Sequence, residues 1–191
     1  MRIVAGAWRG RTLVAPVGTA TRPTSDRVRQ ALFDMLWHAP WAGRERVEGA
    51  VVLDAFAGTG ALGLEALSRG AARAVFIEHD PAALATLRRN IAACGADAVA
   101  RVVPADVARP PRADAGAGLV FLDPPYGQNL VTTGAKSLSD AGWIALDALL
   151  VAETGRDEPL TLALPCLTDR THGAARITVW RFVRGGVIAG M

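Results

Sequence analysis

Four apolar segments of this chain each run into an acidic residue, and segments with helical periodicity separate them. The apolar segments span residues 50–54, 74–78, 99–103 and 119–122, and the acids are Asp54, Glu78, Asp106 and Asp123. Short apolar runs of this kind are typical of strands buried on both faces of a parallel sheet. Because such strands alternate here with helices, the sequence predicts a doubly wound α/β fold with the four carboxylates along one edge of the sheet.

Glycine and proline mark where the intervening helices begin. Gly58, Gly60 and Gly63 form a G-x-G-x-x-G turn after the first strand, in the strand–turn–helix context that gives this short motif its weight. Asp80 followed by Pro81 predicts the start of the next helix, because aspartate caps a helix and proline fits its first position.

The remaining segments complete the sheet. We expect a helix over residues 131–142 and a strand over 148–153. Two closing strands over 160–164 and 176–183 should be separated by a hairpin loop at 169–173.

The first thirty residues hold six arginines against one aspartate, although the net charge of the whole chain is only +3. Residues 1–20 contain two short β-prone runs around a turn rich in glycine and arginine, which predicts a small hairpin outside the main sheet. This charge indicates contact with a polyanion, with a solvated arm as the alternative. The candidate residues for this contact are Arg2, Trp8, Arg9, Arg11 and Arg27. Trp8 could stack on a base or could dock the hairpin onto the body.

A helix should follow this segment and end at Pro40. Its apolar face comprises residues that recur at helical spacing, namely Val28, Ala31, Leu32, Met35 and Leu36. Arg27 and Arg29 fall outside that stripe.

The chain of 191 residues is long enough for one domain with a proper core, residues 21–191, with the hairpin as an extension. No apolar run approaches the roughly 18 residues that a membrane span needs, and the start lacks the apolar centre of a signal peptide. We therefore expect the protein to stay in the cytoplasm, and we also expect it to be a monomer. Cys94 and Cys166 are interpreted as buried small hydrophobes, not as metal ligands.

The acids discriminate between cofactors. A dinucleotide would place its pyrophosphate at the glycine turn, where Asp54 would repel it. S-adenosylmethionine has no phosphate and carries an ammonium and a sulfonium. We expect Asp54 to face its methionine part, Glu78 to accept from the ribose hydroxyls and Asp106 to accept from the adenine amine.

The segment Asp123-Pro124-Pro125-Tyr126 ends the fourth strand, because neither proline can donate to a sheet. It could be only a strand exit. It could also hold an exocyclic amine of a nucleobase: the Asp123 carboxylate and the Pro124 carbonyl each accept one amine hydrogen, and Tyr126 stacks on the base. Such a base must lie in a loop or be flipped out of a helix.

These motifs resemble known enzymes. Asp-Pro-Pro-Tyr is similar to the amino-methyltransferase signature, and residues 54–60 resemble the first motif of class I S-adenosylmethionine enzymes. Residues 1–11 and 22–33 add a likeness to the RsmD family, which extends over residues 1–153 and weakens beyond. The likeness implies a Rossmann-like class I methyltransferase fold, with a mostly parallel seven-stranded sheet and helices on both faces.

The resemblance also implies the activity: methylation of the N2 amine of one guanine, guanine 966, in bacterial 16S ribosomal RNA of a partly assembled small subunit. Asp123, Pro124, Pro125 and Tyr126 would be catalytic, and the segment around Arg22 would cover the cofactor. The full set of expected cofactor contacts is Arg22, Thr24, Asp54, Phe56, Ala57, Gly58, Gly60, Glu78, His79, Asp106 and Val107.

Three other functions are weighed against this one. An adenine-N6 DNA methyltransferase would use the same tetrad, but the chain has no segment long enough for a target-recognition insertion. A dehydrogenase is disfavoured by Asp54. A non-catalytic RNA-binding assembly factor would not need intact acids at four strand ends.

Overall fold

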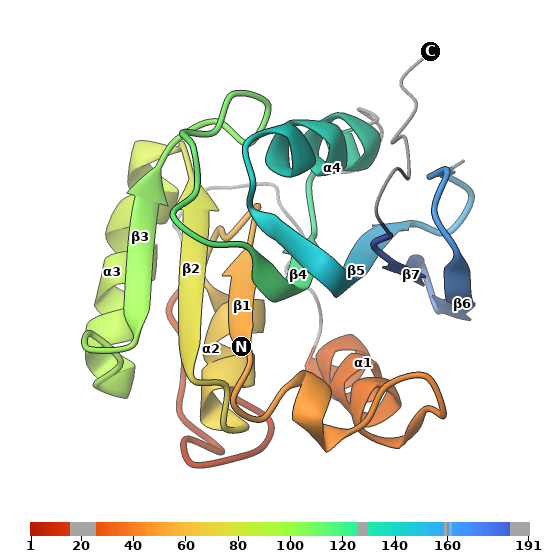
Figure 1. Ribbon diagram of the computed structural model, residues 1–191. Helices are drawn as coiled ribbons and strands as arrows, with labels where there is room; N and C mark the ends of the chain where they lie inside the picture. Colours follow the sequence, from red (N-terminus) through yellow and green to blue (C-terminus); the bar gives the residue numbers. More distant parts are fainter. Residues whose placement is uncertain (16–25, 126–129, 159, 161, 184–191) are drawn as a thin grey trace.

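The computed structural model describes residues 1–15, 26–125, 130–158, 160 and 162–183. Its strands form one seven-stranded sheet in the order β3-β2-β1-β4-β5-β7-β6 (Figure 1). The strands are β1 Val51–Asp54, β2 Arg73–Glu78, β3 Ala100–Pro104, β4 Ala117–Leu122, β5 Ile144–Gly155, β6 Cys166–His172 and β7 Ala175–Arg181. The first five pair in parallel, whereas β7 is antiparallel to both β5 and β6. The predicted Rossmann-like fold is confirmed, with a mixed sheet.

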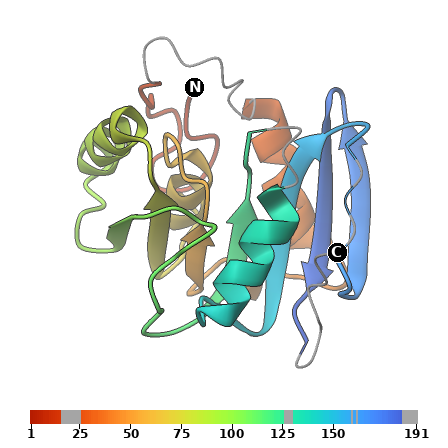
Figure 2. The same cartoon turned by 90° about the horizontal axis from the view of Figure 1, so that it is seen from above.

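Helices cover both faces of the sheet (Figure 2). They are α1 Asp26–His38, α2 Ala61–Ser68, α3 Pro81–Cys94 and α4 Leu130–Asp140, with a short 3-10 turn η1 at Arg44–Arg46. The first three lie on one face and α4 lies on the other. None of these helices, within the described part of the chain, is long and apolar enough to cross a lipid bilayer.

Alternate residues of the central strands enter two separate hydrophobic clusters. Phe76 and Phe121 pack with α1, α2 and α3, whereas Val75 and Val120 pack with α4. This is why the strands read as continuous apolar runs: both of their faces are buried.

The predicted limits of α3 are confirmed at both ends. The Asp80 side chain accepts a hydrogen bond of 2.7 Å from the Ala83 N–H, and Pro81 occupies the first helical position. Gly95 ends the helix in the left-handed conformation, at φ +66°.

Residues 1–15 form a hairpin outside the main sheet, joined by a single antiparallel bridge between Arg2 and Thr12. It packs on α2, where the Ala7 N–H donates to the Ser68 carbonyl at 2.7 Å. In Figure 1 this red segment reaches below the amino ends of the parallel strands.

Arg29 corrects the prediction for α1. The sequence placed it outside the apolar stripe, but its side chain is fully buried and its Nε lies 3.5 Å from Glu65 Oε2. Position 29 precedes Phe33 by one turn, so it belongs to the buried face. The pattern failed because the counter-charge comes from another helix, which helical periodicity cannot reveal.

The last hairpin also differs from the prediction. The sixth strand spans Cys166–His172, not 160–164, and the turn lies at 173–174. β6 is an edge strand with mostly exposed, polar residues, so its sequence lacks the apolar alternation from which a strand is predicted. The buried Leu162 and Leu164 instead fill the cluster on the α4 side from an irregular segment. Cys166 is exposed, contrary to expectation, whereas Cys94 is buried as predicted.

Candidate active site

The four predicted carboxylates follow neighbouring strands. Asp54 and Glu78 close β1 and β2, and Asp106 and Asp123 come just after β3 and β4. Since β3, β2, β1 and β4 are adjacent and parallel, all four acids lie at the carboxyl edge of the sheet, the upper edge in Figure 1. This edge is where open α/β sheets bind ligands.

Asp54 is the most buried of these acids, with 2% of its surface exposed. Its Oδ2 accepts a hydrogen bond of 2.9 Å from the Gly63 N–H at the start of α2. Burial, with a smaller contribution from the nearby Glu78 carboxylate, raises the pKa of Asp54 to about 7 against the opposing effect of the Gly63 hydrogen bond. The group therefore changes charge near neutral pH.

The glycine turn brings α2 close to the sheet. Gly60 caps α2 with φ +79°, a conformation that favours glycine. A Cβ on Gly63 would lie only 2.3 Å from the Phe76 ring, so no larger residue fits between helix and strand. Close packing is thus the role of the third glycine of the motif.

Glu78 holds the same turn from the neighbouring strand. Its Oε2 accepts from the Gly58 N–H at 2.8 Å, and its Oε1 accepts from the N–H groups of His79 and Asp80 at 2.7 and 2.8 Å. These bonds fix the carboxylate at the sheet edge. A carboxylate oxygen has about two acceptor sites, so Oε2 keeps capacity for a ligand hydroxyl.

A cavity of about 360 Å³ opens at the carboxyl edge, beside the row of four carboxylates. Its walls include four of the expected cofactor contacts, Phe56, His79, Asp106 and Val107, together with Pro125 of the tetrad. The remaining lining residues are Ala108, Leu130, Thr133 and Gly134. The structure thus brings Pro125 of the tetrad to the same cavity as four of the predicted cofactor residues.

Gly134 of α4 is a site residue that the sequence reasoning missed. A Cβ at this position would lie 3.1 Å from a Val107 methyl group and 3.2 Å from the Phe56 ring. The missing side chain therefore lets α4 pack closely against these two cavity walls. The available signal was a glycine inside a helical segment, which often has a packing reason.

The tetrad follows β4 as predicted. Asp123 is half-buried, Pro124 is buried and Pro125 is exposed at the cavity. Three predicted site residues, Tyr126, Arg22 and Thr24, lie outside the described residues. Ala57 is buried beneath the glycine turn, where its N–H donates to the Ile77 carbonyl at 3.1 Å.

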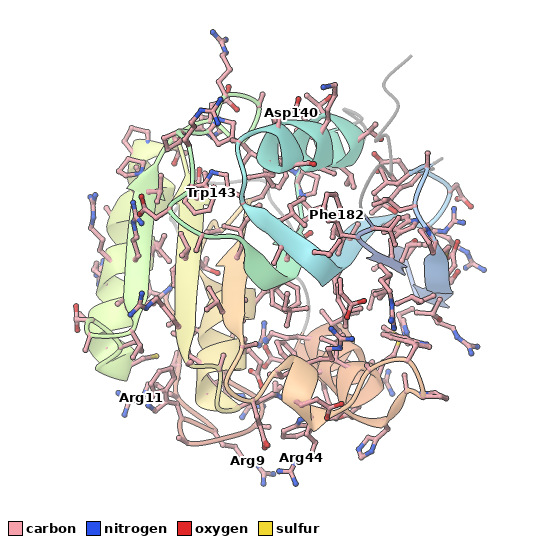
Figure 3. All side chains as sticks on the ribbon, in the orientation of Figure 1. Arg9, Arg11, Arg44, Asp140, Trp143 and Phe182 are labelled. Atoms are coloured by element: carbon pink, nitrogen blue, oxygen red, sulfur yellow. The ribbon has the colours of Figure 1, made fainter. Side chains whose placement is uncertain are left out.

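The candidate RNA contacts occupy a different part of the molecule. Arg9 and Arg11 lie at the lower end of the view in Figure 3, away from the carboxyl edge. Arg9, Arg11 and Arg27 are exposed, and Arg11 donates to the Ala93 carbonyl. Arg2 is exposed and lies 3.6 Å from Asp26.

The Trp8 side chain packs against the hydrophobic cluster on the α2 side, and the Trp8 backbone N–H donates to Ser68 Oγ at 3.0 Å. Of the two roles considered for Trp8, the structure shows docking of the hairpin. Stacking on a base stays a prediction for the part of the ring that remains accessible.

Comparison with known proteins identifies the family. A family model described as "Conserved hypothetical protein 95" matches residues 1–184. The "Ribosomal RNA small subunit methyltransferase D" of Escherichia coli (strain K12) is 44% identical over 156 residues, which cover 81% of this chain and 74% of the relative. The chain belongs to the RsmD family. The "Putative rRNA methyltransferase YlbH" of Bacillus subtilis is 32% identical over 188 residues, 95% of this chain and 98% of that relative.

Solved structures agree with membership of the RsmD family. The "Putative methyltransferase yhhF" of Escherichia coli superposes with a TM-score of 0.79 at 36% identity, covering 96% of this chain and 98% of the other. An RNA methyltransferase from Salinibacter ruber, solved with S-adenosyl-L-homocysteine, has a TM-score of 0.61 at 19% identity and covers 85% and 95% of the two chains. The latter likeness shows the fold alone. The RsmD-family match includes both the carboxylate row and the β6–β7 hairpin.

Proposed function

We propose that this chain transfers a methyl group from S-adenosylmethionine to the N2 amine of a guanine in 16S ribosomal RNA, guanine 966, and that it does so as a cytoplasmic monomer on a partly assembled small subunit. One observation carries the proposal: Pro125, of the segment that can hold an amine, lines the same cavity as Phe56, Asp106 and Val107. The ribosomal RNA substrate is supported by the names of the relatives in Escherichia coli and Bacillus subtilis.

The cavity residues fit an adenosine group. Phe56 and Val107 offer apolar walls, and a volume of about 360 Å³ lies within the usual range for small-molecule sites, about 300–1,000 Å³. Asp106 Oδ1 accepts from the Ala108 N–H at 2.8 Å, which leaves acceptor capacity for an adenine amine. Glu78 would hold the ribose and Asp54 the methionine ammonium. When bound, S-adenosylmethionine supplies an electrophilic methyl group on its sulfonium.

Asp123 and Pro124 would prepare the nucleophile. The lone pair of an exocyclic amine is conjugated with the base, which makes the nitrogen a poor nucleophile. The Asp123 carboxylate and the Pro124 carbonyl would each accept one amine hydrogen and favour a tetrahedral nitrogen. They would also stabilise the positive charge that develops on nitrogen as it is methylated. The surplus proton would leave to Asp123 or to water after the bond has formed.

Positioning is the second contribution of the site. Tyr126 would stack on the base and keep the nitrogen in line with the bond that breaks. Because the tetrad lies at a sheet edge, the guanine must come from a loop or a flipped-out position.

The test uses the full chain with Asp123→Ala. We expect methyl transfer from a labelled donor to undermethylated small subunits or free 16S RNA to fall by at least about 10²-fold, because both positioning and charge stabilisation are lost. Donor affinity, measured by calorimetry, should change little. The control is Asp114→Ala, which removes an exposed carboxylate paired with Arg101 and should keep full activity.

Mapping the methylated nucleotide completes the experiment. An unchanged turnover number for Asp123→Ala would remove the amine-holding role. Methylation at a base other than guanine would remove the proposed specificity while leaving the general mechanism.

A further inference from the structure

A fifth carboxylate lies at the carboxyl end of the strand beside the tetrad. Glu153 belongs to β5 and has only 8% of its surface exposed. A buried carboxylate is costly unless donors or a counter-charge compensate it. The mechanism above gives Glu153 no role.

The strand register places Glu153 next to Asp123. β4 and β5 are parallel neighbours in which Phe121 pairs with Val151 and Leu122 pairs with Ala152. Asp123 directly follows β4 and Glu153 is the next residue of β5, so the register carried one position past the end of β4 sets them side by side, about one strand spacing of 4.8 Å apart. Figure 1 shows the two strands side by side.

The face of the sheet on which Glu153 lies follows from the strand period. Side chains alternate between faces along a strand, so Glu153 shares its face with Val151, and the pleat of β4 continued by one residue would put Asp123 on the face of Phe121. Phe121 and Val151 are members of the same hydrophobic cluster. Glu153 is therefore a buried acid at the register position beside Asp123, where the amine site is proposed.

The guanine base offers a donor at the matching position. Its Watson–Crick edge carries the N1–H next to the N2 amine, whereas adenine has an unprotonated acceptor at N1. We propose that Glu153 is a specificity-determining residue that accepts a hydrogen bond from guanine N1–H while Asp123 and Pro124 hold the N2 amine. Glu153 already has an interaction within the chain, but a carboxylate has about four acceptor sites and can take a further donor. This inference rests on the proposed function.

The role predicts how the enzyme treats 2-aminopurine. This base keeps the exocyclic N2 amine but has no hydrogen at N1, so it would face the Glu153 carboxylate with a lone pair. Wild-type kcat/KM should be about ten- to hundredfold lower for 16S RNA with 2-aminopurine at the mapped position than for RNA with guanosine, because a buried hydrogen bond is replaced by repulsion.

Glu153→Gln should reverse part of that preference. The glutamine amide can donate to the unprotonated N1 of 2-aminopurine, so the guanosine reaction should slow while the 2-aminopurine reaction holds or improves. We expect the guanosine/2-aminopurine ratio of kcat/KM to fall at least about tenfold, with donor affinity unchanged. Glu48→Gln, which changes an exposed carboxylate paired with Arg44, is the matched control and should keep the wild-type ratio.

The outcomes separate this inference from the function on which it rests. If the wild type methylates guanosine but accepts 2-aminopurine equally well, the N1–H contact does not exist, whether or not the variant folds. If Glu153→Gln lowers kcat/KM equally for both bases, Glu153 has only a structural role. Absence of guanine methylation by the wild type would overturn the proposed function and this inference together.

Discussion

Asp54 is the single residue whose chemistry depends most on its surroundings. Its pKa of about 7 means that a large share of the free protein carries a neutral Asp54 at pH 6. A ligand ammonium placed beside the carboxyl would favour the charged form and lower this pKa again. Binding of the donor should therefore be linked to loss of a proton.

We predict that binding of S-adenosylmethionine at pH 6 releases close to one proton from the wild type. The value follows from calorimetric titrations in buffers with different ionisation enthalpies. Asp54→Asn, which cannot titrate, should release none. Equal proton release from both proteins would assign the proton to another group. No release from the wild type would mean that the methionine ammonium of the donor does not bind beside Asp54.

For individual residues, the sequence predicted where the acids lie, but not which of them is buried or how its pKa is shifted. A strand-end position is visible in the chain, because apolar runs reveal strands and parallel strands share an edge. The burial of Asp54 and the close approach of Gly134 to Phe56 depend on contacts between distant segments. Neither has a local signature of its own.

The hairpin, α1 and α2 meet at one buried carboxylate. Glu65 is fully buried, accepts from the Val4 and Ala5 N–H groups at 2.8 and 3.0 Å, and pairs with Arg69 Nε at 2.8 Å. Arg29 brings α1 to the same carboxylate. The three elements are thus fixed to one another by charge and backbone hydrogen bonds, in addition to apolar packing.

Glu65→Ala should destabilise the protein by about 3–5 kcal/mol, because it leaves two buried guanidinium groups without their shared carboxylate. Urea unfolding followed by circular dichroism measures the change. Glu48→Ala, which removes an exposed pair with Arg44, should cost no more than about 1 kcal/mol. Similar losses for the two variants would show that the buried network contributes no more than a surface pair.

Elements with a regular apolar pattern or a capping motif were predictable from the sequence, and α3 with its Asp80 and Gly95 ends shows why. β6 was not, because an exposed edge strand needs no apolar alternation. The buried position of Arg29 was also hidden, since its partner Glu65 lies in a helix 36 positions further along the chain.

On the scale of the whole molecule, the tetrad and the arginine-rich hairpin lie toward opposite ends of the sheet. Residues 123–125 of the tetrad follow β4 at the carboxyl edge, whereas Arg9 and Arg11 lie at the lower end of the view in Figure 3, toward the amino edge. An RNA that contacts both must extend along the molecule between these edges. A large, structured RNA would meet this requirement more readily than a short oligonucleotide.

Changing Arg9 and Arg11 together to glutamine should weaken RNA binding and flatten its salt dependence by roughly 1.5 in the slope of log K against log salt, since two phosphate contacts would be lost. Filter binding over a range of salt concentrations gives the slope. Donor affinity should not change. Arg156→Gln, an exposed arginine of the β5–β6 turn, is the control; an unchanged slope in the double variant would mean that the hairpin arginines are only solvated.

The polar side chains of β6 also affect whether a strand of another molecule can pair with this edge of the sheet. This strand forms one border of the sheet, and its Asp169 is paired with Arg176 of β7 while Arg170 is exposed. A strand from another molecule could add to this border only by covering those charges, at a desolvation cost that backbone hydrogen bonds would have to overcome. These charges therefore oppose the addition of a strand from another copy at this border.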